Sequence, residues 1–216
     1  MYKFLRRGLL VLLACLPFMA HAAATPQQVV QGTTDKVLGE LSSKREQFKQ
    51  DPEAFYLALN SILTPVIDFD GFARGVMTVR YSRQATAEQM QSFQESFKRS
   101  LVKFYGSALL EYDNQEIRML PAPPAREPGR ASVNMEVVGR TGAIYPLTYT
   151  LEQKGGDWKV RNVIINGINV GKLFRDQFAE SMRSNGNDLD KVIATWGDAV
   201  ARAQETANAQ QGGSQQ

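Results

Sequence analysis

Apolar and polar residues alternate along two neighbouring stretches in the second half of the chain, and this pattern predicts a β-hairpin. Between Tyr145 and Leu151 every second residue is apolar, and Trp158 and Val160 repeat the pattern after a turn at residues 155–157. A period of two indicates strands with one apolar and one solvated face. The central question is therefore what covers the apolar face.

The alternation breaks in the second strand of this hairpin. Asn162 stands where an apolar residue is due, and residues 163–165 are all apolar. We therefore expect a β-bulge here, or a strand end that is covered on both faces. Asn162 is interpreted as a core amide that is hydrogen-bonded to backbone at the bulge, with contact to a ligand as the alternative.

Two more alternating stretches precede the hairpin, one with Ile117 and Met119 and one from Val133 to Val137. Together they predict a four-stranded antiparallel meander sheet. Apolar residues spaced three and four positions apart predict helices before and after it. Because helices are the only apolar cover available, they should wrap the inner face of the sheet. The expected fold class is α+β, in the order helices, sheet, helices.

The first residues have the layout of a cleaved secretory signal peptide. A basic start with Lys3, Arg6 and Arg7 is followed by an apolar run too short to span a bilayer and by an A-x-A site ending at Ala22. We expect removal of residues 1–22, a single domain over 23–203, and a disordered tail over 204–216, which lacks large apolar residues. The expected location is the periplasm.

Removal of the signal peptide changes the chemistry of the chain. It takes away three of 25 basic residues, so 22 remain against 22 acidic ones, and the mature chain carries no net charge that would favour nucleic acid. It also takes away Cys15 and His21, the single cysteine and the single histidine. Disulfides, Cys/His zinc sites and Ser-His-Asp or Cys-His mechanisms are thereby excluded.

Two kinds of charged residue remain as candidates for chemistry. Asp68 and Asp70 could form an acid/base pair, but the favoured interpretation makes Asp68 a helix N-cap and Asp70 a first-turn acid. Several basic residues could meet a phosphate at a pocket mouth, although a solvated face is the simpler interpretation. These residues are Arg74, Arg80, Arg83, Arg161, Lys172 and Arg175.

Large apolar residues are numerous on the predicted helices and on the inner face of the sheet. They would make either a well-packed core or a cleft for an apolar ligand, and composition does not separate these two outcomes. The candidate ligand-binding residues are Phe69, Phe72, Val76, Met77, Phe93, Phe97, Leu101, Phe104, Tyr105, Leu109, Met119, Val133, Met135, Val137, Leu147, Tyr149, Leu151, Trp158, Val160, Phe174 and Phe178.

Several segments, in this order and spacing, resemble the MlaC family, also called toluene-tolerance or Ttg2-type periplasmic proteins. They are residues 69–73, 85–89, 105–112, Trp158-Lys159-Val160 and 175–178. The chain departs from the family pattern at four positions, where Gly, Asp, an acidic residue and Ser are usual. In order, these positions hold Val79, Asn162, Asn166 and Asn169.

The resemblance implies an NTF2-like α+β fold with an apolar pocket between sheet and helices, and a carrier that shuttles phospholipid. Its implied partners are an outer-membrane lipoprotein complex and an inner-membrane ABC transporter with an MCE-domain protein, and its implied role is to maintain outer-membrane lipid asymmetry. We expect a monomer without catalysis or cofactor. An NTF2-like enzyme using Asp68 or Asp70, or a peptide-binding module, are the alternatives.

The physical chemistry of transfer agrees with this implied role. Exposing an acyl chain of about 16 carbons to water costs on the order of 13 kcal/mol, at roughly 0.8 kcal/mol for each CH₂. A carrier must therefore supply an apolar interior, and no bond is broken.

Overall fold

The structure is a computed structural model that describes residues 24–124 and 127–212. The expected signal peptide lies outside these residues. The elements are α1 (Pro26–Gln50), α2 (Pro52–Leu63), α3 (Phe69–Ser82), α4 (Ala87–Leu110), β1 (Glu116–Met119), β2 (Arg130–Val138), β3 (Ile144–Lys154), β4 (Asp157–Ile165), β5 (Ile168–Asn169), α5 (Val170–Ser184) and α6 (Leu189–Gly212).

Side-chain caps mark the starts of the first two helices. The Thr25 hydroxyl accepts from the Gln28 backbone N–H in a capping box at α1, and the Asp51 carboxylate accepts from Ala54 N–H at α2. At its other end the chain differs from expectation, because α6 continues through residues 204–212. This segment is rich in Ala and Gln, which favour helix without an apolar face.

The sheet is an antiparallel meander in the order β1-β2-β3-β4-β5, with five strands where the sequence predicts four. The additional strand, β5, has two residues, and Ile168 pairs with Ile165 of β4. Asn166 (φ 48°) and Gly167 (φ 81°) form the tight turn between them in the left-handed region, which Asn and Gly tolerate. Two residues are too few to show an alternation in the sequence.

The predicted β-bulge is confirmed in β4. Thr150 pairs with Asn162 and Leu151 pairs with Val160, so Arg161 is the extra residue. The bulge moves Asn162 to the face of Thr150, which corrects its expected place on the apolar face.

The Asn162 amide is bonded to backbone, as its favoured interpretation requires. Its Oδ1 accepts from Gly171 N–H at 3.0 Å, and its Nδ2 donates to Asn169 Oδ1 at 3.1 Å. Asn169 Oδ1 also caps α5 by accepting from Lys172 N–H at 2.9 Å. Two departures from the family pattern thus hold the start of α5 against β4.

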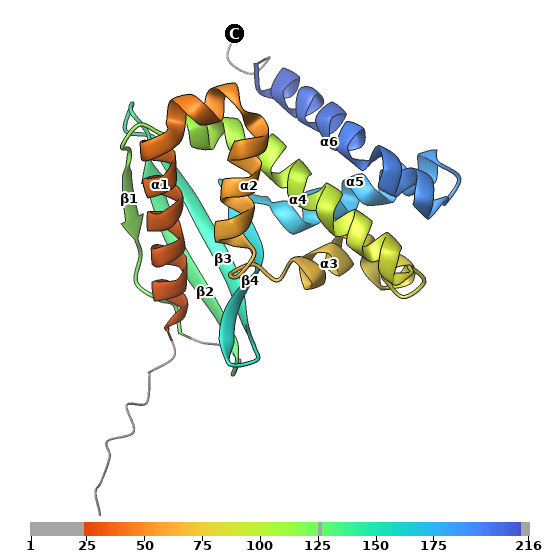
Figure 1. The fold of residues 1–216 in the computed structure, drawn as a ribbon. Helices are drawn as coiled ribbons and strands as arrows, with labels where there is room; N and C mark the ends of the chain where they lie inside the picture. Colours follow the sequence, from red (N-terminus) through yellow and green to blue (C-terminus); the bar gives the residue numbers. More distant parts are fainter. Residues whose placement is uncertain (1–23, 125–126, 213–216) are drawn as a thin grey trace, which may run out of the picture.

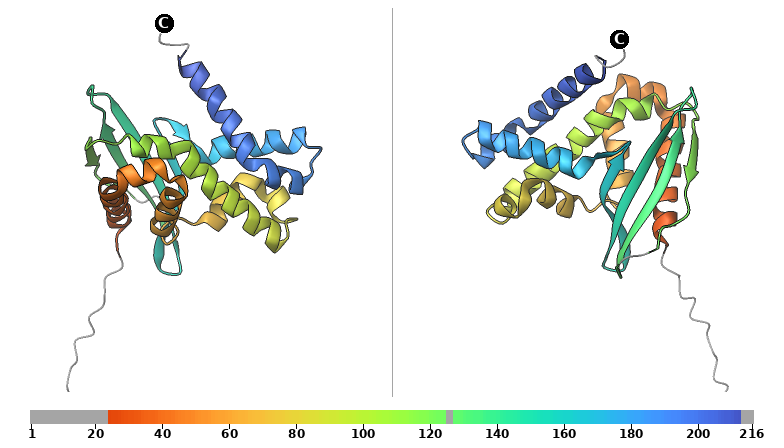
Figure 2. Two further views of the ribbon diagram at one scale, coloured as in Figure 1. Left: turned by 45° about the horizontal axis from the view of Figure 1, so that its top comes forward. Right: turned by 180° about the vertical axis from the view of Figure 1, so that it is seen from behind.

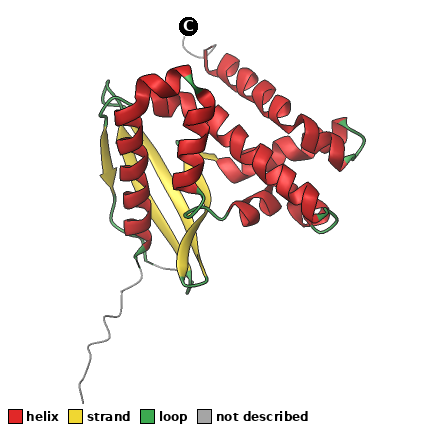
Figure 3. Ribbon diagram, viewed as in Figure 1, coloured by secondary structure: helices red, strands yellow, loops and turns green. Residues whose placement is uncertain are grey.

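The helices divide into two groups around the sheet. α1 and α2 lie over one sheet face, and the view from behind shows the opposite face without a covering helix (Figures 1 and 2). α3, α5 and α6 lie beyond the β4 side of the sheet, and α4 reaches from one group to the other (Figure 3). The helices therefore cover one face, as predicted, but only some of them lie on it.

Candidate functional site

The apolar core is divided accordingly. The sheet cluster joins α1 to the inner sheet face through the buried residues Val30, Val133, Met135, Leu151 and Val160. The helix cluster joins α3–α6 through the buried residues Phe72, Ala73, Val76, Met77, Met90, Phe93, Phe97, Val170, Phe174, Phe178, Met182, Val192, Trp196 and Val200. A third cluster, around Leu41, Phe48 and Phe55, lies between α1, α2 and α4.

The predicted binding residues are distributed over all three clusters. In or against the sheet cluster lie Met119, Val133, Met135, Leu147, Tyr149, Leu151, Trp158 and Val160. In or against the helix cluster lie Phe69, Phe72, Val76, Met77, Phe93, Phe97, Leu101, Phe104, Tyr105, Phe174 and Phe178. Leu109 packs on the third cluster, and Val137 is half-buried beside Ile117.

Many of the aromatic residues predicted to bind ligand pack among the helices instead of lying against the sheet. The Phe93 ring centroid is 5.1 Å from that of Trp196 and 5.4 Å from that of Phe178, both in edge-on geometry. Phe93, Phe97 and Trp196 are fully buried. For these residues the structure favours packing over ligand contact.

Helix α4, which carries Phe93 and Phe97, is less buried in its C-terminal half. Leu101, Phe104 and Tyr105 on α4 pack against the helix cluster but remain only half-buried. Phe104 and Tyr105 lie with ring centroids 4.8 Å apart. This half of α4 therefore presents apolar surface that the protein itself does not fully cover.

The inner face of the sheet shows a matching change. Leu151 and Val133 are fully buried, whereas Leu147 and Tyr149 on β3 are half-buried. In the ladder Tyr149 pairs with Val163 and Leu147 pairs with Ile165, and these two β4 residues pack against the helix cluster. The inner face of the β3–β4 pair therefore contacts both the sheet cluster and the helix cluster.

Sequence reasoning missed Val163 and Ile165 as site residues. The signal was present, because a bulge before Asn162 restores an inward alternation at these two positions. Tyr145 was expected on the inward face with Leu147, but it is 45% exposed near the end of the sheet.

Two tyrosines on these half-buried walls have unusual surroundings. Burial raises the pKa of Tyr149 to about 12, and burial also raises the pKa of Tyr105 to about 12. Neither phenol has a hydrogen-bond partner within the described residues. Their hydroxyls therefore lie in apolar surroundings and form no hydrogen bond with the described residues.

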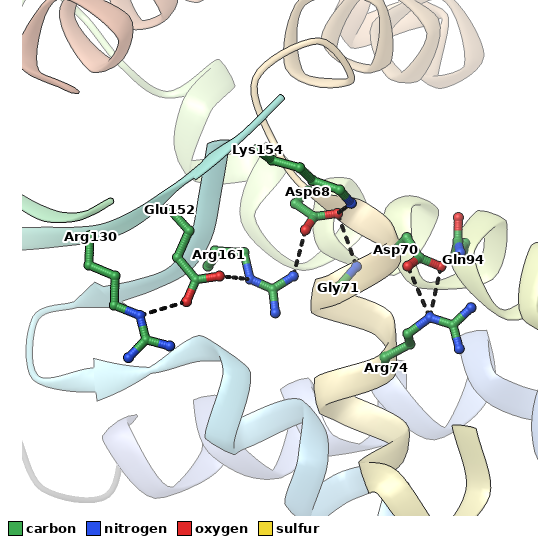
Figure 4. Close-up of polar contacts among 9 residues, drawn as sticks. All are labelled: Asp68, Asp70, Gly71, Arg74, Gln94, Arg130, Glu152, Lys154 and Arg161. Carbon is green, nitrogen blue, oxygen red and sulfur yellow. Dashed lines mark hydrogen bonds and ion pairs between the residues drawn. The ribbon is translucent and has the colours of Figure 1, made fainter. Parts of the chain in front are cut away.

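A separate polar centre lies where α3 begins (Figure 4). The Asp68 carboxylate caps α3 by accepting from Gly71 N–H at 3.1 Å. It also accepts from Arg161 Nη1 at 2.6 Å and from Lys154 Nζ at 3.0 Å. Burial alone would raise the pKa of Asp68, but the Gly71 hydrogen bond and the two cations outweigh it and lower that pKa.

Arg161 links this carboxylate to the sheet. Its Nε lies 3.2 Å from Glu152 Oε2, and Arg130 Nε donates to Glu152 Oε1 at 3.0 Å. Gly71 is required for the close approach, because a Cβ at that position would lie 1.2 Å from Arg161 Nη1. The bulged residue thus ties the first turn of α3 to β3 and β4.

Asp70 forms a different and more exposed pair. It accepts from Arg74 Nε at 2.9 Å and from Gln94 Nε2 at 3.0 Å. The capping interpretation of Asp68 and the first-turn placement of Asp70 are confirmed. Each carboxylate has its own cation, so the geometry gives no shared proton for acid/base chemistry.

The hollow beside this centre is polar. It measures about 290 Å³, and charges of both signs line it in equal number. Its lining residues are Asp68, Asp70, Gly71, Glu152, Gln153, Lys154, Lys159 and Arg161. It therefore does not match the apolar pocket that the sequence predicts.

The candidate phosphate-binding cations do not converge on one site. Arg74 pairs with Asp70, Lys172 pairs with Asp176, and Arg175 Nε donates to Gly75 O at 3.0 Å. The Arg80 guanidinium lies over the Tyr81 ring. Apart from Arg161 in the polar centre, these residues are exposed.

Comparison with known proteins decides the family. The family model described as "MlaC protein" matches residues 31–198. This chain belongs to the MlaC family. The MlaC-family chain is 61% identical over 208 residues to the toluene tolerance protein ttg2D of Pseudomonas putida, covering 96% of each protein.

Two further relatives are more distant. The intermembrane phospholipid transport system binding protein MlaC of Haemophilus influenzae is 23% identical over 154 residues, covering 70% of the MlaC-family chain described here and 72% of the relative. A solved phospholipid-binding protein from Ralstonia solanacearum, in complex with a phospholipid, has a TM-score of 0.75 at 24% identity. That match covers 83% of this chain and 98% of the other, and it shows that the two share a fold.

Proposed function

We propose that this protein is a periplasmic phospholipid-binding carrier. Its relatives are named for intermembrane phospholipid transport and for toluene tolerance, and a protein of the same fold binds a phospholipid. The observation that carries the proposal is the band of half-buried apolar residues shared by α4 and the β3–β4 pair. No helix among the described residues is both long and apolar enough to cross a bilayer.

The acyl chains lie, in this proposal, between the sheet cluster and the helix cluster. Leu101, Phe104 and Tyr105 form one wall, and Leu147 and Tyr149 form part of the other. Burial of apolar surface is non-directional, so this wall needs no charged constellation. The headgroup stays in water, which implies weak headgroup selectivity.

The remaining family properties are part of the same proposal. The carrier exchanges phospholipid with an outer-membrane lipoprotein complex and with an inner-membrane ABC transporter that has an MCE-domain partner, and so maintains lipid asymmetry. It acts as a monomer without a cofactor and catalyses no reaction. The helix-covered antiparallel sheet supports an NTF2-like architecture, which superposition on solved NTF2-like proteins tests.

Blocking the proposed acyl site with a charge tests the function. Leu147→Arg should abolish lipid uptake from vesicles and leave a folded protein, because Leu147 is half-buried and faces the proposed site. The control is Ile144→Arg on the same strand, where the side chain is 51% exposed, and it should bind normally. Mass spectrometry of the extracted lipid measures occupancy.

The choice of position follows from burial. Val133 also faces inward, but it is fully buried, and an arginine there would unfold the protein instead of testing the site. Absence of phospholipid from wild-type protein, both as purified and after incubation with vesicles, would refute the proposed function. Normal loading of Leu147→Arg would show that the acyl chains lie elsewhere.

A further inference from the structure

The tyrosine hydroxyls of the described residues fall into three groups. Three donate to partners in the protein: Tyr56 to Glu95, Tyr81 to Asn187, and Tyr112 to the Gln115 carbonyl. Tyr145 is substantially exposed and has water available. Tyr105 and Tyr149 remain, half-buried and without a protein partner in the described structure.

The surroundings of these two phenols are apolar. Tyr149 packs against the sheet cluster and lies opposite Val133 on one neighbouring strand and opposite Val163 on the other. Tyr105 packs against the helix cluster beside Phe104. A phenylalanine would supply the same apolar contacts, and leaving a hydroxyl unsatisfied in such a site is unfavourable.

The hydroxyls are not sealed inside the protein. Among the described residues, Trp196 Nε1 is a polar side-chain atom that is fully buried and has no hydrogen-bond partner. The phenolic oxygens of Tyr105 and Tyr149 also have no partner, but neither is fully buried. Each phenolic oxygen therefore keeps some accessible surface, and the two residues belong to the walls that the proposed function assigns to the acyl chains. A ligand held between these two walls would meet two hydrogen-bond donors within otherwise apolar surfaces.

A phospholipid carries suitable acceptors at the head of its acyl chains, namely the two ester carbonyl oxygens. We propose that the Tyr105 and Tyr149 hydroxyls donate hydrogen bonds to these ester carbonyls and so fix the depth at which the lipid sits. This inference rests on the proposed function and deepens it. It makes the carrier selective for diacyl ester lipids over lipids that lack the carbonyls, whatever their headgroup.

A diester lipid and its diether analogue with the same chains and headgroup provide the test. Purified, delipidated protein is incubated with phosphatidylglycerol vesicles of either kind, and bound lipid is measured by mass spectrometry. Tyr105→Phe and Tyr149→Phe should each weaken diester binding by about 2- to 10-fold, the value of one neutral hydrogen bond. Diether binding should be the same in wild type and both variants.

Tyr145→Phe is the matched control, because it removes an exposed hydroxyl from the same strand as Tyr149. It should leave the binding of both lipids unchanged. In the lipid-free state, Tyr105→Phe and Tyr149→Phe should unfold in urea at the same or a higher midpoint, because neither hydroxyl has a protein partner to lose.

Three results would overturn the assignment of the phenols while leaving the carrier function intact. They are unchanged diester binding in both variants, an equal loss for diester and diether lipids, and a lower unfolding midpoint in the lipid-free state. Failure of the wild-type protein to take up the diester lipid would overturn the proposed function itself, and the two failures are thereby distinguished.

Discussion

Replacing Asp68 by Asn tests whether the bulged hairpin and α3 are held together by charge. Asparagine keeps the size of the side chain and can still cap α3 by accepting from Gly71 N–H. The substitution removes the negative charge that faces Arg161 and Lys154. The variant therefore isolates the ion pairs from the cap.

The expected loss follows from burial. The Asp68 side chain is 9% exposed, and a hydrogen bond to a charged group contributes about 1.5–3 kcal/mol in such a site. Lys154 is 60% exposed, so its share is small, and Arg161 retains Glu152 as a partner. We expect Asp68→Asn to lower the free energy of unfolding by about 2–3 kcal/mol.

Asp70→Asn is the matched control. Its pair with Arg74 is exposed on both sides, at 44% and 49%, so solvent screens it and its loss should change stability much less. Urea denaturation of both variants and the wild type, followed by circular dichroism, measures the difference. Equal losses in the two variants, or a loss below about 1 kcal/mol for Asp68→Asn, would refute the reasoning about burial.

The pH dependence supplies a second check with a defined sign. The folded pKa of Asp68 is lowered below its ordinary value of 3.8, so the folded protein binds this proton less readily than the unfolded chain. The stabilisation is therefore fully present above the unfolded pKa and is lost as pH falls through the folded pKa. The gap between wild type and Asp68→Asn should be constant near neutral pH and should shrink below about pH 4.

Two other substitutions test neighbouring parts of the structure. Gly71→Ala should force Arg161 away from Asp68, because the added Cβ would lie 1.2 Å from Arg161 Nη1. The substitution should lower the free energy of unfolding, measured by urea denaturation, by about 1–3 kcal/mol. Combined with Asp68→Asn it should be less than additive, and full additivity would contradict a shared interaction. Phe93→Ala should cost about 3–5 kcal/mol, because the ring is fully buried, and a loss below about 1 kcal/mol would show that it is not core.

The sequence located the strands and their apolar face because period-two alternation is a local property. Leu151 and Val133, assigned to that face from spacing alone, are fully buried on it and belong to one cluster. The bulge was also predictable, since Asn162 interrupts the alternation within a single strand. The same pattern constrains the register of the strands, because a shift by one residue would turn every apolar side chain outward.

The partner of each helix face was not predictable in the same way. The spacing of Phe93 and Phe97 shows that one side of α4 is apolar, but it does not show whether a sheet or another helix covers that side. The covering ring of Trp196 lies about a hundred residues later in the chain, and only the tertiary fold brings it 5.1 Å from Phe93. Fewer of the apolar residues on this side of α4 face the sheet than the sequence pattern predicts.

Long-range charge pairing was beyond the sequence for the same reason. Asp68 could be identified as a cap from local residues, but Arg161, its partner 93 positions later, was grouped with the exposed cations. What places Arg161 against Asp68 is the bulge, which removes Arg161 from regular pairing in β4. A residue that breaks the pattern of one element is here the residue that joins it to another.

A division between closed clusters and a half-buried band suits a protein that must lose its ligand repeatedly. If the acyl site were the whole core, release of the lipid would leave an empty interior, and the cost of an unfilled cavity would favour collapse or unfolding. Here Leu151 in the sheet cluster and Phe93 in the helix cluster are fully buried by the protein's own atoms. The fold can therefore rest on these two clusters, while the proposed acyl site, which comprises Leu147 and Tyr149 on β3 and the C-terminal half of α4, lies outside their fully buried parts.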